Sequence, residues 1–153
     1  MKLAYSETYK VSKTFDAPLD FVYSWCTDFQ EDDLKMIGSK NIRRIHEKTR
    51  DRVIWTVEGR TTPAGTQGVR AVWLKPPNGW RLESTGDGFE VGEYKLRSLG
   101  KNRTRLDMTF TAFAERKSGI ESSASYVKDA NAHWEGYGAQ LMKDYSRSLG
   151  QKR

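Results

Sequence analysis

An amphipathic stretch near the end of the chain, Ser122 to Leu149, most constrains what this sequence can fold into. Wound as a helix at about 100° per residue, it gathers its apolar residues on one broad face, while Lys128, Glu135 and Arg147 fall on the other. So wide an apolar face has to pack against another layer of the protein. The residues on that face are Val127, Ala130, Trp134, Tyr137, Gly138, Leu141, Met142, Tyr145 and Leu149. We therefore expect one long helix that covers one sheet.

Two glycines, Gly136 and Gly138, lie inside this helix. Each costs up to about 1 kcal/mol relative to alanine in a helix interior. Gly138 lies on the apolar face, so its missing side chain leaves space there. This indicates either a close contact between helix and strand backbones or a gap beside an internal cavity.

The chain before the helix, from about Tyr9 to Ala114, has the texture of β-strands with one helical insert. Turn residues recur at intervals of roughly ten residues, and apolar residues alternate with polar ones between them. The insert follows a first strand at residues 8–15 and consists of two short helical patterns. One starts at Pro18, and the other runs from Phe29 to Ile37 and ends at Gly38. Half-buried antiparallel strands are the simplest account of the rest.

The alternation also predicts which strand residues face the helix. The predicted inward positions are Val53, Trp55, Val57, Val69, Ala71, Trp73, Trp80, Leu82, Ser84, Gly92, Tyr94, Leu96, Leu106, Met108, Phe110 and Ala112. Glu90 and Glu93 have opposite parity, so at most one of them faces inward. Because nearly all inward positions are apolar, few polar groups are left for chemistry. This pattern favours binding over catalysis.

The composition excludes several kinds of site. With 153 residues, the chain is expected to form a single domain, residues 1–153. The single Cys26 rules out an intramolecular disulfide, and we interpret it as core filler. Only His46 and His133 are present as imidazole ligands, so neither a metal nor a cofactor is expected.

The charge and hydropathy patterns limit the partners. The formal net charge is +6, but the basic residues are spread along the strands and both termini. We therefore expect no specific nucleic-acid partner. The sequence has no apolar run of membrane-spanning length and no pattern of a signal peptide, which predicts a soluble cytoplasmic protein. A homodimer is left open.

His133 is the most interesting titratable group. At helical spacing it shares the margin of the apolar face with Tyr126 and Tyr137. A histidine beside a phenol could transfer protons in a cyclisation or dehydration. A half-exposed histidine hydrogen-bonded at the helix edge is the alternative, and we favour it. His133 and Tyr137 are thus the candidate catalytic residues.

The run from Val11 to Tyr23, in which Ala17-Pro18 separates a strand from an amphipathic helix, resembles the opening of START-like proteins. This superfamily is also called the SRPBCC or Bet v 1-like group and includes polyketide cyclase and dehydratase-like proteins and lipid transfer proteins. The closing helix supports the resemblance, which spans nearly the whole chain. It implies an α+β helix-grip fold, in which a curved antiparallel sheet of about seven strands wraps around the C-terminal helix. Two short helices follow the first strand, and an apolar cavity lies between sheet and helix. The family has no universal catalytic residues.

Combined with the strand alternation, the resemblance predicts the residues that line such a cavity. They are Trp55, Val57, Ala71, Trp73, Tyr94, Leu96, Met108 and Phe110 on the sheet, and Trp134, Tyr137, Gly138 and Leu141 on the helix. The expected function is to bind a small hydrophobic or amphipathic molecule, such as a lipid, a polyketide-like compound or an aromatic compound. One alternative is a polyketide cyclase or dehydratase that uses the same cavity. The other is an interaction domain whose aromatic residues fill it.

Overall fold

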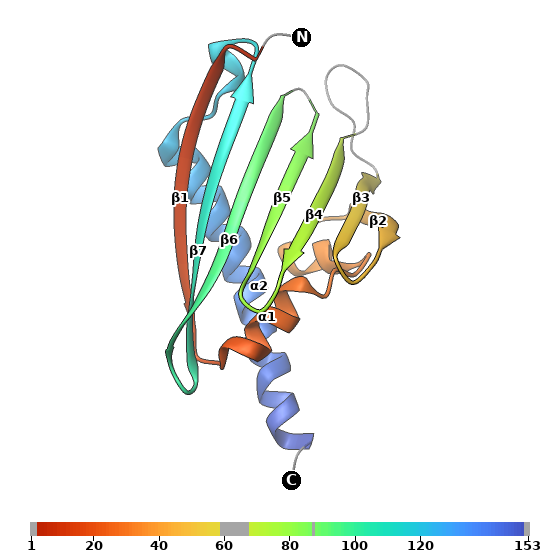
Figure 1. Ribbon diagram of the computed structural model, residues 1–153, viewed down its shortest axis with the longest axis vertical. Coiled ribbons are helices and arrows are strands. Elements are labelled where there is room, and N and C mark those ends of the chain that lie inside the picture. The colour runs from red at the N-terminus through yellow and green to blue at the C-terminus, as the bar shows by residue number, and fades with distance from the viewer. Residues whose placement is uncertain (1–2, 59–67, 87, 152–153) are drawn as a thin grey trace.

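The structure, a computed structural model, describes residues 3–58, 68–86 and 88–151. Within these residues, seven strands form one curved antiparallel sheet in the order β1-β7-β6-β5-β4-β3-β2. The long helix α2 crosses one face of the sheet, and the helices α1 and η1 lie at its lower end (Figure 1). In chain order the elements are β1 (Tyr5–Phe15), α1 (Leu19–Thr27), η1 (Asp33–Ile37), β2 (Ile42–Lys48), β3 (Arg52–Glu58), β4 (Val69–Lys75), β5 (Gly79–Thr85), β6 (Phe89–Gly100), β7 (Arg103–Ala114), η2 (Lys117–Gly119) and α2 (Ser123–Gln151). The predicted helix-grip arrangement is confirmed.

Helix α2 begins where the sequence predicts it. The Ser122 hydroxyl accepts a hydrogen bond from the backbone N–H of Ser125 at 3.2 Å, which satisfies one of the N–H groups at the helix start. The close backbone contact in α2 occurs at Gly136, not at Gly138 where the sequence analysis considered one, and its partner is η1 rather than a strand. A Cβ there would lie 2.7 Å from the carbonyl oxygen of Met36, so this glycine lets α2 approach the end of η1. Gly138 instead faces the ring of Phe15, whose Cε1 would lie 3.3 Å from an added Cβ.

The core lies between α2 and the central strands, toward the lower end of the sheet. Leu96 on β6 pairs with Leu106 on β7, and both side chains are fully buried beside Leu141 of α2. The buried side chains of this core include Tyr9, Val11, Phe15, Val22, Val53, Val72, Trp80, Leu96, Leu106, Met108 and Leu141. The predicted inward parities of β3, β5, β6 and β7 agree with this core.

The predicted facing of β4 is wrong. One parity of the strand carries three apolar residues, Val69, Ala71 and Trp73, and the other carries two, but Val72 of the second set is buried while Val69 is 41% exposed. The cause is the pairing with β3, in which Val72 lies opposite the buried Val53. Cross-strand partners share a face and successive residues alternate. Ala71 and Trp73 therefore lie on the outer face, away from α2.

The insert is shorter and tighter than predicted. Its second helix, η1, is a 3₁₀-helix that starts at Asp33 rather than Phe29, and it ends at Gly38 with φ 74°, the left-handed conformation that glycine adopts readily. The backbone N–H of Arg43 on β2 donates to the carbonyl of Glu31 at 2.9 Å. In the β2–β3 pairing, the register shifts between Ile45 and Glu47, which agrees with the bulge that the opposite parities of Ile42 and Ile45 indicate. The insert thus packs directly on the β2 edge of the sheet.

Candidate functional site

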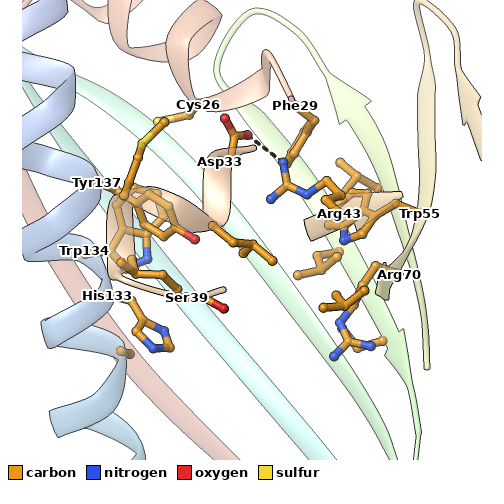
Figure 2. A pocket seen from close by; sticks show the side chains of 18 of the residues that line it. Cys26, Phe29, Asp33, Ser39, Arg43, Trp55, Arg70, His133, Trp134 and Tyr137 are labelled. Atoms are coloured by element: carbon orange, nitrogen blue, oxygen red, sulfur yellow. Dashed lines mark hydrogen bonds and ion pairs between the residues drawn. The ribbon is translucent and has the colours of Figure 1, made fainter. Parts of the chain in front are cut away.

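A cavity of about 950 Å³ lies between the inner face of the sheet, α2 and the insert. Side chains from all three parts line it, as Figure 2 shows for a selection of them. Nine of the described lining residues are aromatic: Trp25, Phe29, Trp55, Trp80, Tyr94, Phe110, Tyr126, Trp134 and Tyr137. Two of them, Trp80 and Tyr94, stack with ring centroids 4.8 Å apart, and Phe110 meets the Tyr94 ring edge-on. Flat apolar surfaces therefore dominate the walls.

The structure brings half of the twelve predicted binding residues to the cavity: Trp55, Val57, Tyr94, Phe110, Trp134 and Tyr137. Leu96, Met108 and Leu141 point the same way but are buried in the core. Gly138 packs against Phe15, and Ala71 and Trp73 lie on the outer face. The cavity therefore occupies only part of the space between sheet and helix, because Leu96, Met108 and Leu141 fill the rest.

Arg43 on β2 joins the insert to the cavity wall, a contact that the sequence analysis missed. Its guanidinium lies over the rings of Phe29, in the insert, and Trp55, on β3, with 5.1 Å and 4.5 Å to the ring centroids. Its Nη1 donates to the Asp33 carboxylate at 2.6 Å and to the carbonyl of Gln30 at 3.2 Å. Arg43 is only 7% exposed, and its Nε is buried without an acceptor among the described residues. A buried guanidinium loses its hydration, and the carboxylate, carbonyl and ring contacts compensate for that loss.

A polar row crosses the inner face of the sheet on β4, β5 and β6. Arg70 on β4 pairs with Ser84 on β5, which pairs with Glu90 on β6, and all three line the cavity. Because the sequence analysis predicted the wrong facing for β4, it did not identify Arg70 as a cavity residue. The alternation along β6 predicts that at most one of Glu90 and Glu93 faces inward, and in the structure Glu90 does. The inward strand positions are therefore less uniformly apolar than predicted.

Tyr126, from the first turns of α2, donates a hydrogen bond from its hydroxyl to the Glu90 carboxylate. Its ring stacks on Tyr9, with centroids 3.9 Å apart and planes 4° from parallel. Burial, followed by the hydrogen bond to Glu90 and its negative charge, raises the pKa of Tyr126 above its usual range. The phenol therefore stays protonated and acts as a donor to the Glu90 carboxylate.

Both candidate catalytic residues line the cavity, Tyr137 deeper than His133. Burial raises the pKa of Tyr137, the positive charge of Arg43 lowers it and the negative charge of Asp33 raises it. His133 is exposed, and no hydrogen bond to its ring is found in the described part of the chain. His133 therefore lies on the exposed side of the lining, and its role stays a prediction.

Three further features bear on the chemistry of the site. Cys26 lines the cavity, and burial raises the pKa of its thiol, so the sulfur is a neutral wall atom rather than a nucleophile. Among residues 3–58, 68–86 and 88–151, no three His, Cys, Asp or Glu side chains cluster in a way that could hold a metal ion. No helix in those ranges is long and apolar enough to span a membrane.

Comparison with known proteins yields matches among solved structures alone, since no protein-family model and no curated protein matches the sequence. The chain is similar to the Zhui aromatase/cyclase from Streptomyces sp. R1128, with a TM-score of 0.66, 13% identity and coverage of 95% of this chain and 96% of that one. It is similar to a START superfamily protein from Mycobacterium smegmatis, with a TM-score of 0.65, 12% identity and coverage of 89% and 97%. This chain has a START-like fold. A norcoclaurine synthase from Thalictrum flavum, in complex with dopamine and hydroxybenzaldehyde, shares the START-like fold at a TM-score of 0.67, 8% identity and coverage of 91% and 88%.

The resemblance that rests on Val11 to Tyr23 is thus confirmed at the level of the fold. Identities of 8% to 13% show nothing further about activity. The function of this START-like chain has to be argued from its own cavity.

Proposed function

We propose that the protein binds a small amphipathic molecule, largely apolar or aromatic, in the cavity between the sheet and α2. The observation that carries the proposal is a volume of about 950 Å³ walled by nine aromatic side chains. Pockets for small organic molecules have this size, this apolar lining and a few convergent polar groups. Here the polar groups are the Arg43–Asp33 pair and Glu90 with Tyr126.

The open volume argues against an interaction domain with a filled cavity. One part of the space between sheet and helix is closed by Leu96, Leu106 and Leu141 at about 0–1% exposure. The cavity beside it stays open although large aromatic side chains surround it. A purely structural core would close such a gap, because each unfilled volume forfeits packing energy.

A matched pair of substitutions in α2 tests the proposal. Ala130 lines the cavity, whereas Ala132 on the same helix is exposed and does not. We expect Ala130→Trp to weaken the binding of the neutral fluorescent probe N-phenyl-1-naphthylamine at least tenfold, because the indole takes up the space. Ala132→Trp should leave the affinity unchanged, and both variants should keep the wild-type circular dichroism spectrum. Equal affinities for both variants and the wild type, or no binding to folded wild-type protein, would refute the proposal.

A second candidate function is that of a cyclase or dehydratase acting in the same cavity. The observation in its favour is the gathering of Glu90, Tyr126, Tyr137 and His133, four groups able to exchange protons, around one volume. The test is to extract the molecule that co-purifies with the protein, return it to stripped protein and follow its mass over time. A change in mass or ring number that needs folded protein would make this an enzyme, and an unchanged compound would leave the binding function.

A further inference from the structure

Glu90 is a cavity-lining carboxylate near the start of β6. Its Oε1 accepts the Tyr126 hydroxyl, and no Lys or Arg forms an ion pair with it in the described residues. Its neighbour on the outer face shows the contrast. Glu93 forms ion pairs with Arg81 at 2.5 Å and with Lys75 at 3.6 Å. One neutral hydroxyl group is a weak substitute for such a counter-charge.

Aromatic rings surround Glu90 on the cavity side. Tyr126 lies 5.4 Å from Phe110 between ring centroids, and Phe110 lies 5.5 Å from Tyr94. The negative charge of Glu90 contributes to the raised pKa of Tyr9, Tyr94 and Tyr126, so the carboxylate is within electrostatic reach of all three phenols. Ring faces beside a carboxylate form an environment that attracts organic cations.

The charge of the whole lining points the same way. The described lining residues include seven Asp or Glu and two Arg, although the chain as a whole carries a net charge of +6. One of the two arginines, Arg43, is already engaged by Asp33. Of the seven carboxylates, Asp28, Asp33 and Asp144 form ion pairs, and Asp32, Glu121 and Asp129 are exposed. Among the described lining residues this leaves Glu90 as the carboxylate that is shielded from solvent without an ion pair, where its charge acts more strongly than in water.

We propose that the cavity binds an organic ammonium ion, a protonated amine on an aromatic or aliphatic body, with the ammonium group on Glu90. The Oε2 atom of Glu90 accepts no hydrogen bond from the described residues and is the acceptor for the ammonium N–H. The body of the ligand lies against Phe110, Tyr94 and Tyr126. This inference rests on the proposed binding function and adds the charge of the ligand to it.

An acidic ligand is the competing occupant, and one of the two lining arginines, Arg43 or Arg70, would be its anchor. Arg70 already donates to the carbonyl of Thr85 at 3.2 Å. The guanidinium of Arg43 already has a carboxylate at 2.6 Å, a carbonyl at 3.2 Å and two ring faces. A ligand carboxylate would have to approach the negative charge of Asp33. Arg43 thus fastens the insert to the sheet. Glu90, by contrast, forms no ion pair within the described residues and, unlike Asp32, Glu121 and Asp129, is not exposed.

Three probes of the same length separate these occupants: 3-phenylpropylammonium, the neutral 3-phenylpropanol and 3-phenylpropanoate. Their affinities are measured by displacement of N-phenyl-1-naphthylamine at pH 7 and low salt. We expect wild-type protein to bind the ammonium at least tenfold more tightly than the alcohol, and the carboxylate most weakly. The Glu90→Gln variant should lose this preference while still binding the neutral probe. Glu93→Gln, a change of the same kind on the outer face of the same strand, should keep it.

The outcomes separate the two levels of the argument. If the neutral probe binds but the ammonium shows no preference over the alcohol, the ammonium site is refuted and the apolar cavity stands. The same holds if Glu90→Gln keeps the preference or if the carboxylate binds best. If no probe binds folded wild-type protein, both proposals fail. Should Glu90→Gln not fold, the comparison of the three probes on the wild type decides.

Discussion

The ion pair between Arg43 and Asp33 holds the insert against the sheet, and replacing Asp33 by Asn tests how strongly. The side chains are 8% and 16% exposed, so the guanidinium would remain charged and nearly dry without its counter-charge. Removing one partner of a buried pair costs about 3–5 kcal/mol. Because Asp33 keeps some exposure and an Asn oxygen can still accept hydrogen bonds, we expect a loss near the lower end, about 3 kcal/mol. In a chain of this length that corresponds to a fall in Tm of about 6–12 °C.

The assay is urea unfolding followed by tryptophan fluorescence, to which Trp55 reports directly because Arg43 lies over its ring. The matched control is Glu58→Gln, which breaks the exposed pair with Arg44, the next residue along β2. Those side chains are 55% and 37% exposed, so the control should cost less than about 1 kcal/mol. Adding Arg43→Met to Asp33→Asn should recover part of the loss, because the unpaired charge is gone. Equal losses for Asp33→Asn and Glu58→Gln would refute the reasoning.

Two further predictions concern packing and titration. Gly136→Ala should lower the free energy of unfolding by about 1–2 kcal/mol, because the clash of its Cβ with the Met36 carbonyl outweighs the gain in helix propensity. The control, Gly150→Ala, has open space around it and should not destabilise the protein. Equal effects of the two changes in urea unfolding would contradict the close contact. Burial, with the charge of Glu90, raises the pKa of Tyr94, so the folded protein holds a proton that the unfolded chain releases above about pH 10, and stability should fall as the pH rises beyond that value. Tyr94→Phe should reduce the loss of unfolding free energy with rising pH by up to about 1.4 kcal/mol per pH unit. The control is Tyr5→Phe, at an exposed position, which should leave this pH dependence unchanged. If Tyr94→Phe also leaves it unchanged, the Tyr94 phenol is not shielded.

The architecture could be predicted from the sequence because its signals are local. The amphipathic pattern of Ser122 to Leu149 and the alternation in Arg105 to Ala114 each depend on neighbours a few residues away. A helix or a strand repeats its facing with a fixed period, so such patterns identify the element and its buried side. The same logic correctly placed Tyr94, Phe110, Trp134 and Tyr137 on the surfaces that face each other.

The facing of β4 could not be settled in this way. Both parities of the strand carry apolar residues: Val69, Ala71 and Trp73 lie on the outer face, and Val72 and Leu74 lie on the inner face. Pairing with β3 sets the facing, since Val72 lies opposite the buried Val53. A contact between two strands does not produce a repeating pattern in the sequence of either strand. Arg70 was therefore not predicted as a cavity residue.

The sequence by itself thus determined the helix, the strands and the apolar faces between them, because these follow from repeats along the chain. The tertiary structure decided where the space between them stays open. It placed the insert over Arg43, brought Gly136 against Met36 and set Tyr126 on Glu90. These contacts join residues far apart in the chain, and their energies depend on burial that exists only once the sheet and helix have come together.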